Sequence, residues 1–240
     1  MFHITPNIIT KHFSRTLLVL CFLFGVSFIA SAYLVYHAPE DYLQGIHAKI
    51  MYIHVPSAWL SLSLYSLLAL FSLGYTIFKN PFYFSVAKAI APIGCGLTFI
   101  TLVTGSIWGK PTWGTWWVWD ARLTSMLILF FIYVGYIGLV RSFEDERKVA
   151  SISSVFAIVG LLNIPIIKFS VDIWNTLHQP SSVFRFDGPT IHIDMLIPLV
   201  VSACCLLFFS CILILLRVRI EYWEKKSSRL RYILKKEIYS

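Results

Sequence analysis

The residues best suited to chemistry are a dense group of tryptophans and two histidines, all in polar segments between long apolar stretches. The run from Trp108 to Arg122 contains five tryptophans: Trp108, Trp113, Trp116, Trp117 and Trp119. One or two tryptophans would fit an ordinary aromatic belt at a membrane surface. Five in so short a run favour a flat apolar shelf for a large planar ligand, with a dense aromatic girdle as the alternative.

Two charged residues follow the tryptophans and add polar chemistry at the edge of this shelf. Asp120 is placed to cap a helix that begins just after it, and Arg122 could pair with carboxylates of a ligand. Helical spacing from Trp113 onward predicts one shared face for Trp113, Trp116, Trp117 and Asp120. Three residues argue against a regular helix at the start of the run: Gly109, Pro111 and Gly114.

The two histidines that could bind a metal lie in different polar segments. His54 comes two residues before Pro56, which we expect in the first turn of a helix, and His178 lies in a polar loop. A lone loop histidine is usually just solvated, but two beside an aromatic shelf favour paired imidazole ligation of a metal. His47 would share a helical face with His54, so it could not approach a flat ligand from the opposite side. Zinc is disfavoured because no third ligand has a suitable spacing.

The elements that position these residues are predicted to be membrane helices. Of the 240 residues, 58% are hydrophobic and only 13% are charged, against about a quarter in soluble domains. Six long apolar runs predict an all-α, polytopic protein that is one membrane domain over residues 1–240. The expected spans are 16–36, 57–78, 89–107, 123–140, 150–167 and 195–216, with an outer tryptophan-rich loop over 108–122. The first is interpreted as a retained helix rather than a cleaved leader.

The fifth expected span is interrupted by Asn163 and Pro165, which predicts a kink or a break near one of its ends. The basic residues predict the orientation, because 15 of the 20 Lys and Arg fall in the two termini and the alternate connections. The positive-inside rule then places both termini in the cytoplasm or its mitochondrial equivalent. Segment 217–240 holds much of this charge and is interpreted as an anchor on anionic membrane lipid rather than as a nucleic-acid site.

The cysteines carry no recognisable chemistry of their own. All five fall inside expected spans and no C-x-x-C pair occurs: Cys21, Cys95, Cys204, Cys205 and Cys211. This excludes a thiol-redox motif, a zinc knuckle and a C-x-x-C-H haem-attachment site. We interpret the cysteines as small apolar packing residues.

These residues together resemble a known family. The tryptophan run ending at Asp120 resembles the WWD motif of cytochrome c maturation proteins. The segments Met51–Trp59 and Trp174–Pro180, which contain His54 and His178, narrow the resemblance to the CcmC family over essentially the whole chain. The resemblance implies b-type haem bound at the outer face, with His54 and His178 as axial ligands to the haem iron and the tryptophan loop beneath the macrocycle.

The resemblance also implies what is done with the haem and which proteins take part. It implies delivery to the haem chaperone CcmE, whose own histidine becomes bonded to a haem vinyl carbon, and association with CcmA, CcmB and CcmD. The protein would be a haem-binding and haem-delivery component rather than an enzyme, and promotion of the covalent attachment to its partner is compatible with that role. It would lie in a bacterial inner membrane, or in the mitochondrial inner membrane if encoded by the organelle.

Two other functions are weighed against this one. A transporter that moves haem or another small molecule through the bundle would usually carry ionisable residues inside its spans, and the expected spans carry essentially none. A quinone-linked membrane cytochrome would usually place its histidines deep in facing helices, whereas His54 and His178 fall near one surface.

Overall fold

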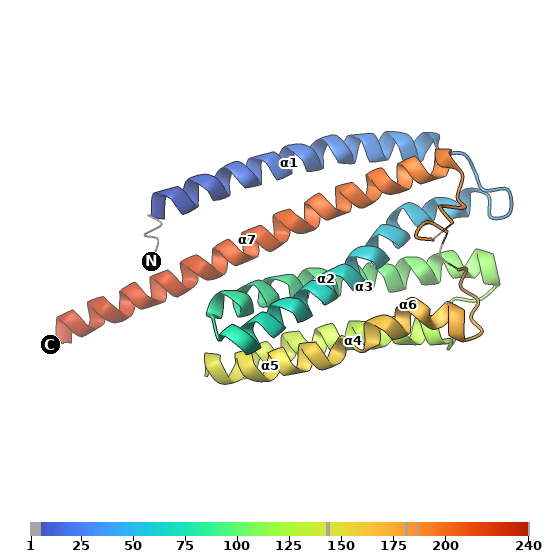
Figure 1. Ribbon diagram of the computed structural model, residues 1–240. Helices are drawn as coiled ribbons and strands as arrows, with labels where there is room; N and C mark the ends of the chain where they lie inside the picture. Colours follow the sequence, from blue (N-terminus) through green and yellow to red (C-terminus); the bar gives the residue numbers. More distant parts are fainter. Residues whose placement is uncertain (1–5, 143–144, 181, 186, 240) are drawn as a thin grey trace.

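The computed structural model describes residues 6–142, 145–180, 182–185 and 187–239, and its regular elements there are all helical (Figure 1). The elements follow the chain in this order: α1 (Pro6–His37), the 3-10 helix η1 (Ile46–Ile50), α2 (Met51–Phe78), α3 (Pro81–Trp113), α4 (Ala121–Arg141), α5 (Glu146–Gly160), α6 (Asn163–Ile173) and α7 (Ile193–Tyr239). The expected all-α class is therefore confirmed.

Six of the described segments are long and apolar enough to cross a membrane, as the sequence predicts. They are His12–His37, Ile46–Phe78, Pro81–Trp113, Ala121–Arg141, Glu146–Ile173 and Ile193–Ser228. Figure 1 shows both described ends of the chain at one end of the bundle, opposite η1 and the segments that follow α3 and α6. We call the end with the chain termini the terminal end and the other the loop end. Which of them faces the cytoplasm stays a prediction.

The helices form two groups that pack along one another. Helices α2 to α6 form one bundle, whereas α1 packs mainly against α7 (Figure 1). Helix α7 also contacts α2 and α3, so it joins α1 to the rest of the protein. Ser31 and Ser202 share a hydrogen bond of 2.8 Å between α1 and α7, which satisfies two hydroxyl groups within an apolar contact.

The fifth span is broken, as the sequence predicts. Helix α5 ends at Gly160 and α6 begins at Asn163, with a short turn at Leu161–Leu162. The Asn163 side-chain amide donates to the Ser125 carbonyl of α4 at 2.9 Å, so its polar group is satisfied inside the bundle. Pro165 lies in the first turn of α6, where its missing N–H costs least.

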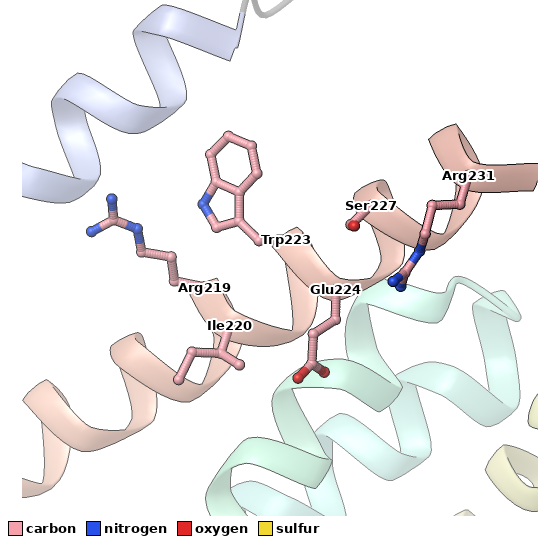
Figure 2. Close-up of a pocket in the computed structure, with 6 residues that line it drawn as sticks. All are labelled: Arg219, Ile220, Trp223, Glu224, Ser227 and Arg231. Carbon is pink, nitrogen blue, oxygen red and sulfur yellow. The ribbon is translucent and has the colours of Figure 1, made fainter. Parts of the chain in front are cut away.

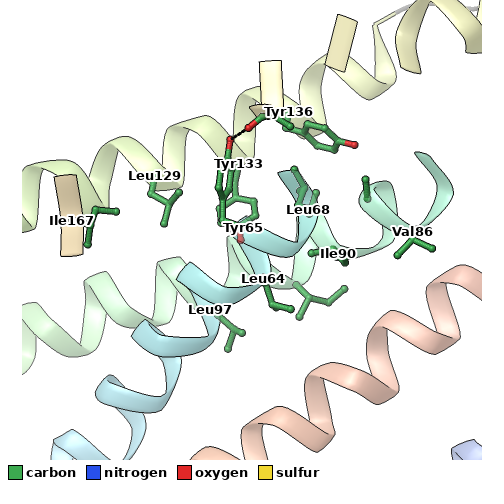
Figure 3. Packing of buried hydrophobic residues seen from close by; sticks show 14 of the residues in the cluster. Leu64, Tyr65, Leu68, Val86, Ile90, Leu97, Leu129, Tyr133, Tyr136 and Ile167 are labelled. Atoms are coloured by element: carbon green, nitrogen blue, oxygen red, sulfur yellow. Dashed lines mark hydrogen bonds between the residues drawn. The ribbon is translucent and has the colours of Figure 1, made fainter. Parts of the chain in front are cut away.

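The core of the bundle contains tyrosines as well as aliphatic side chains (Figure 3). Tyr65 and Tyr133 pack edge to face with ring centres 5.0 Å apart. Their hydroxyl groups donate to backbone carbonyls of Ala157 and Ser61, at 3.0 and 2.8 Å. Because lipid offers no water to a buried hydroxyl, these bonds let large polar rings fill the space between helices.

Two helix boundaries differ from the expected ones. Helix α2 begins at Met51 rather than at 57, so Pro56 is its sixth residue instead of a first-turn proline, and His54 lies in the first turn. Helix α3 continues to Trp113, so the expected break before that point is wrong. Pro111 lies inside the last turn of α3, and the helix ends only where Gly114 adopts a left-handed conformation with φ of 78°.

Candidate functional site

The imidazole of His54 is held in one orientation by helix α3. Its Nδ1 lies 3.1 Å from both the Thr101 carbonyl and the Thr104 hydroxyl oxygen. The Thr104 hydroxyl already donates to the Ile100 carbonyl at 2.6 Å, so its oxygen is an acceptor for His54. Two acceptors at Nδ1 place the proton there and leave the lone pair on Nε2, which is the state that a metal requires.

His178, in the segment between α6 and α7, also has its Nδ1 hydrogen-bonded to a backbone carbonyl. Its Nδ1 donates to the Gln179 carbonyl at 3.1 Å, which again leaves Nε2 as the free nitrogen. Burial lowers the pKa of His178 below its ordinary value; the bond to Gln179 opposes this shift, and the positive charge of Arg122 reinforces it. A lowered pKa keeps the imidazole neutral near pH 7, the form that binds metals.

The fold brings these two histidines together from distant parts of the chain. Their ring centres are 6.4 Å apart and their planes are inclined by 32°. Metal–imidazole nitrogen bonds are about 2 Å long, so two imidazoles on opposite sides of one ion have ring centres roughly 6 Å apart. In the described part of the chain, neither Nε2 has a hydrogen-bond partner. The separation of the two ring centres is thus compatible with both imidazoles binding one metal ion.

Two of the tryptophans lie directly beside this histidine pair. The Trp108 ring meets His54 edge to face at 5.7 Å, and the Trp113 ring lies 6.1 Å from His178. Both tryptophans belong to the last two turns of α3. Each imidazole therefore has an indole neighbour, which supplies apolar surface to a planar ligand.

The other three tryptophans, Trp116, Trp117 and Trp119, lie beyond the end of α3. The expectation of a regular helix from Trp113 onward is therefore wrong. The chain is irregular from Gly114 to Asp120, because the left-handed residue Gly114 turns it away from the axis of α3. Trp117 and Trp119 pack edge to face at 5.5 Å. Trp116 and Trp119 are 57% and 75% exposed, so they offer indole surface outward.

Asp120 caps α4, as predicted. Its Oδ1 accepts a 2.7 Å hydrogen bond from the Leu123 amide. Its other oxygen, Oδ2, is buried without a partner among the described residues, and so is Nε1 of Trp117. Such orphaned polar atoms are costly unless something else satisfies them. Asp120 also acts on His178 through its charge, so its unpartnered oxygen is available near that histidine for a polar-edged ligand.

Arg122 lies next to this cap, and two nitrogens of its guanidinium group already donate hydrogen bonds within the protein. Its Nε donates to the Ser170 hydroxyl at 3.1 Å and its Nη2 to the Lys168 carbonyl at 3.4 Å, which ties α4 to α6. The charges of Arg122 and Asp120 both act on His178. Arg122 therefore lies within electrostatic reach of the histidine pair and keeps further N–H groups for an anionic ligand.

The structure also identifies supporting residues that sequence reasoning missed. Gln44 accepts a 2.7 Å hydrogen bond from Nε1 of Trp108 and so holds that indole against His54. Thr101 and Thr104 orient His54 from α3. No local pattern marks these residues, because their roles depend only on which helices pack together.

Gly105 has no side chain, and this leaves space for the ring of His54 against α3. A Cβ atom at this position would lie 2.9 Å from Cε1 of His54, closer than side chains normally approach. We expect Gly105→Ala to push the imidazole off its two Nδ1 acceptors and to weaken ligand binding by roughly tenfold, as loss of an orienting partner typically does. The measurement is a titration of the purified protein with haem, followed by absorption.

The control for that prediction is Gly96→Ala in the same helix, where a new Cβ would meet nothing within 4 Å. Both variants add one methyl group to α3, so a general effect on the helix would appear in both. Equal haem affinity of the Gly105→Ala variant and the unmodified protein would contradict the positioning role.

The fold and this site define a class: a polytopic helical membrane protein with a facing histidine pair and a cluster of indoles at one end of its bundle. Comparisons with known proteins identify the family within this class. Residues 2–233 match the model of the family described as CcmC, Heme exporter protein C. The chain is 52% identical over 166 residues to "Heme exporter protein C" of Bradyrhizobium diazoefficiens, covering 69% of this chain and 63% of that protein.

Other relatives come from a plant and from a second bacterium. A "Putative cytochrome c biosynthesis ccmC-like mitochondrial protein" of Marchantia polymorpha is 47% identical, over 79% of this chain and 82% of its own length. "Heme exporter protein C" of Escherichia coli K12 is 44% identical, over 76% of this chain and 73% of its own length. The chain belongs to the CcmC, or heme exporter protein C, family.

Proposed function

We propose that the protein binds b-type haem at the outer face of the membrane and delivers it to the chaperone CcmE during cytochrome c maturation. The observation that carries this proposal is the pair of His54 and His178 rings, 6.4 Å apart with each Nδ1 held by the backbone. The names of the relatives, which mention heme export and cytochrome c biosynthesis, support the same ligand.

The surrounding side chains have separate roles in this proposal. His54 and His178 hold the iron from two sides, and Trp108 and Trp113 offer apolar faces beside them. Arg122 attracts a propionate through the N–H groups that Ser170 and Lys168 leave free. Nε1 of Trp117 would find its missing acceptor in the same ligand.

Binding and presentation are sufficient for this role. The bound haem supplies the reactive vinyl group, while the chain holds the iron and fixes its orientation. The exposed rings of Trp116 and Trp119 offer an apolar surface to the incoming partner. We expect CcmA, CcmB and CcmD to assist after loading.

The proposed location follows from the charges and the helices. The terminal end would lie in the cytoplasm or its mitochondrial equivalent, because most Lys and Arg fall there. The histidine pair lies at the loop end and would then face the periplasm or the intermembrane space. The membrane would be the bacterial inner membrane or the mitochondrial inner membrane.

The test is an absorption spectrum of the purified protein, made with and without coexpressed CcmE. We expect a b-type Soret band that acid–acetone extraction removes, and its transfer to the chaperone when CcmE is present. A protein free of haem in both preparations would contradict the proposal. Accumulation of haem inside sealed vesicles without CcmE would favour the transporter instead.

A further inference from the structure

His178 lies in a segment without regular helix, so its position opposite His54 depends on how that segment is attached to the bundle. Apart from ring contacts with His54 and Trp113, its hydrogen bonds among the described residues are local. Its Nδ1 donates to the Gln179 carbonyl at 3.1 Å, and its own carbonyl accepts from the Thr176 hydroxyl at 3.3 Å. Bonds between sequence neighbours fix the shape of a segment but not its place on the helices. The attachment must therefore come from the two ends of the segment.

The first end is attached to α6. The Trp174 amide donates to the Ser170 carbonyl at 3.0 Å, and the Ser170 hydroxyl accepts a hydrogen bond from Arg122 of α4 at 3.1 Å. The start of the segment is thus fixed to α6 and, through Arg122, to α4. Neither of these helices carries His54, so a second attachment is needed to set the distance between the two imidazoles.

The second end of the segment closes into a small loop over residues 182–191, which we call the closed loop. The Ser182 carbonyl accepts hydrogen bonds from the Thr190 amide at 2.9 Å and from the Thr190 hydroxyl at 3.4 Å. The Gly188 amide donates to the Arg185 carbonyl at 3.3 Å, and Gly188 adopts a left-handed conformation with φ of 87°. These bonds make the closed loop a compact unit that can be held from a few points.

Apolar side chains hold the closed loop against the loop end of the bundle. Val183 and Ile191, near its two ends, pack against a buried cluster that the chain builds from the residue after α1, the first turn of α2 and the second turn of α7. The cluster consists of Ala38, Met51, Tyr52 and Leu199. The closed loop therefore rests on the same part of α2 that carries His54.

One aromatic contact attaches the closed loop directly to α2. The ring of Phe184 lies 4.8 Å from the ring of Trp59, between centres, with the planes inclined by 58°. Trp59 also packs against the buried cluster, although Phe184 itself is 63% exposed. Trp59 is five residues after His54 in α2, about 7.5 Å along the helix axis. The helix that presents one imidazole thus also holds the loop beside the other.

We propose that Trp59 is a positioning residue for the histidine pair: its contact with Phe184 holds the closed loop on α2 and so keeps His178 opposite His54. Three residues separate His178 from the start of the closed loop, and one of them is Pro180, whose ring restricts φ. So short and stiff a connection passes a displacement of the loop on to the imidazole. The inference rests on the proposed function, because it concerns the second axial ligand of the haem iron.

The spectrum of haem bound to the full-length Trp59→Leu variant tests this role. Leucine keeps an apolar side chain on α2 but removes the ring that meets Phe184. We expect His54 to remain bound and His178 to be lost, so the absorption and EPR spectra should change from low-spin, six-coordinate to high-spin, five-coordinate iron. Haem affinity should fall about tenfold, as after the loss of other groups that orient a metal ligand. Added imidazole should restore the low-spin spectrum, and Trp59→Phe, which keeps a ring, should retain most of it.

Two further variants separate this contact from a general loosening of the protein. Phe184→Leu, in an exposed loop, should give the same spectral change, and the double variant should lose little more than either single one, because both remove one contact. The matched control is Trp223→Leu. Trp223 lines a shallow hollow on α7 at the terminal end (Figure 2), so its loss should leave the haem spectrum unchanged.

The possible failures are distinguishable. Low-spin haem at normal affinity in both Trp59→Leu and Phe184→Leu would overturn the positioning role and leave the proposed function intact. Fully additive losses in the double variant, or an equal loss in Trp223→Leu, would also overturn it. Absence of haem from the unmodified protein would overturn the proposed function and this inference together.

Discussion

His54→Ala and His178→Ala are each expected to lose bound haem, with an affinity lower by a hundredfold or more. Orienting partners of metal ligands already contribute about tenfold to a hundredfold, so removal of a ligand itself should cost at least as much. The measurement is the Soret absorbance per mole of purified protein, together with the amount of haem transferred to CcmE.

Chemical rescue separates lost ligation from lost folding in these variants. His178→Gly leaves room for a free imidazole in a half-buried loop, so added imidazole should restore part of the Soret band. His47→Ala is the matched control, because His47 is exposed on η1 and should leave the spectrum unchanged. Normal haem content in both His54→Ala and His178→Ala would contradict the axial assignment.

The second large effect is expected on stability, at a close helix contact in the core. A Cβ atom on Gly94 would lie 2.2 Å from the hydroxyl oxygen of Tyr133, whose ring is fully buried. That oxygen donates to the Ser61 carbonyl, so it cannot retreat without losing a bond inside the bundle. Overpacking of this kind costs about 1–3 kcal/mol, and loss of the buried hydrogen bond adds to it.

Thermal denaturation in detergent measures this effect. Gly94→Ala should lower the midpoint by several degrees, whereas Gly96→Ala in the same helix should leave it unchanged or raise it, because nothing lies within 4 Å of a Cβ there. Adding Tyr133→Phe to Gly94→Ala removes only the nearest clashing atom and leaves Cζ and Cε1 of the ring in place, so most of the loss should remain. Equal midpoints for the two single variants would show that α3 and α4 can separate without cost.

Much of the fold can be predicted from the sequence because it depends on local properties. The length of each apolar run determines whether it crosses a membrane, and this predicts all six spans. The break near Asn163 and Pro165 and the cap at Asp120 are also local, since each depends on the chemistry of neighbouring residues. The boundaries are less predictable, because Pro56 and Pro111 lie inside helices, where proline would ordinarily indicate a helix start or a break.

The tryptophan run shows where local reasoning fails. Gly109 and Pro111 suggested a loop, but α3 continues through both, and Trp113 packs close to the position where Gly109 lacks a Cβ. Gly114, in a left-handed conformation, then redirects the chain. A single residue with positive φ thus separates Trp108 and Trp113, which lie beside the histidines, from the exposed Trp116 and Trp119.

The sequence by itself determined six membrane helices, the residues at one end that could hold haem, and the side of the bundle that carries the positive charge. Only the tertiary structure decided that the His54 and His178 rings lie 6.4 Å apart, that Gln44 and Thr104 bond to Trp108 and His54, and that Arg122 bonds to α6. The physical reason is that apolar length, charge and capping act along the chain. Distances between side chains depend on how whole helices pack, and that is decided by contacts between residues far apart in the sequence.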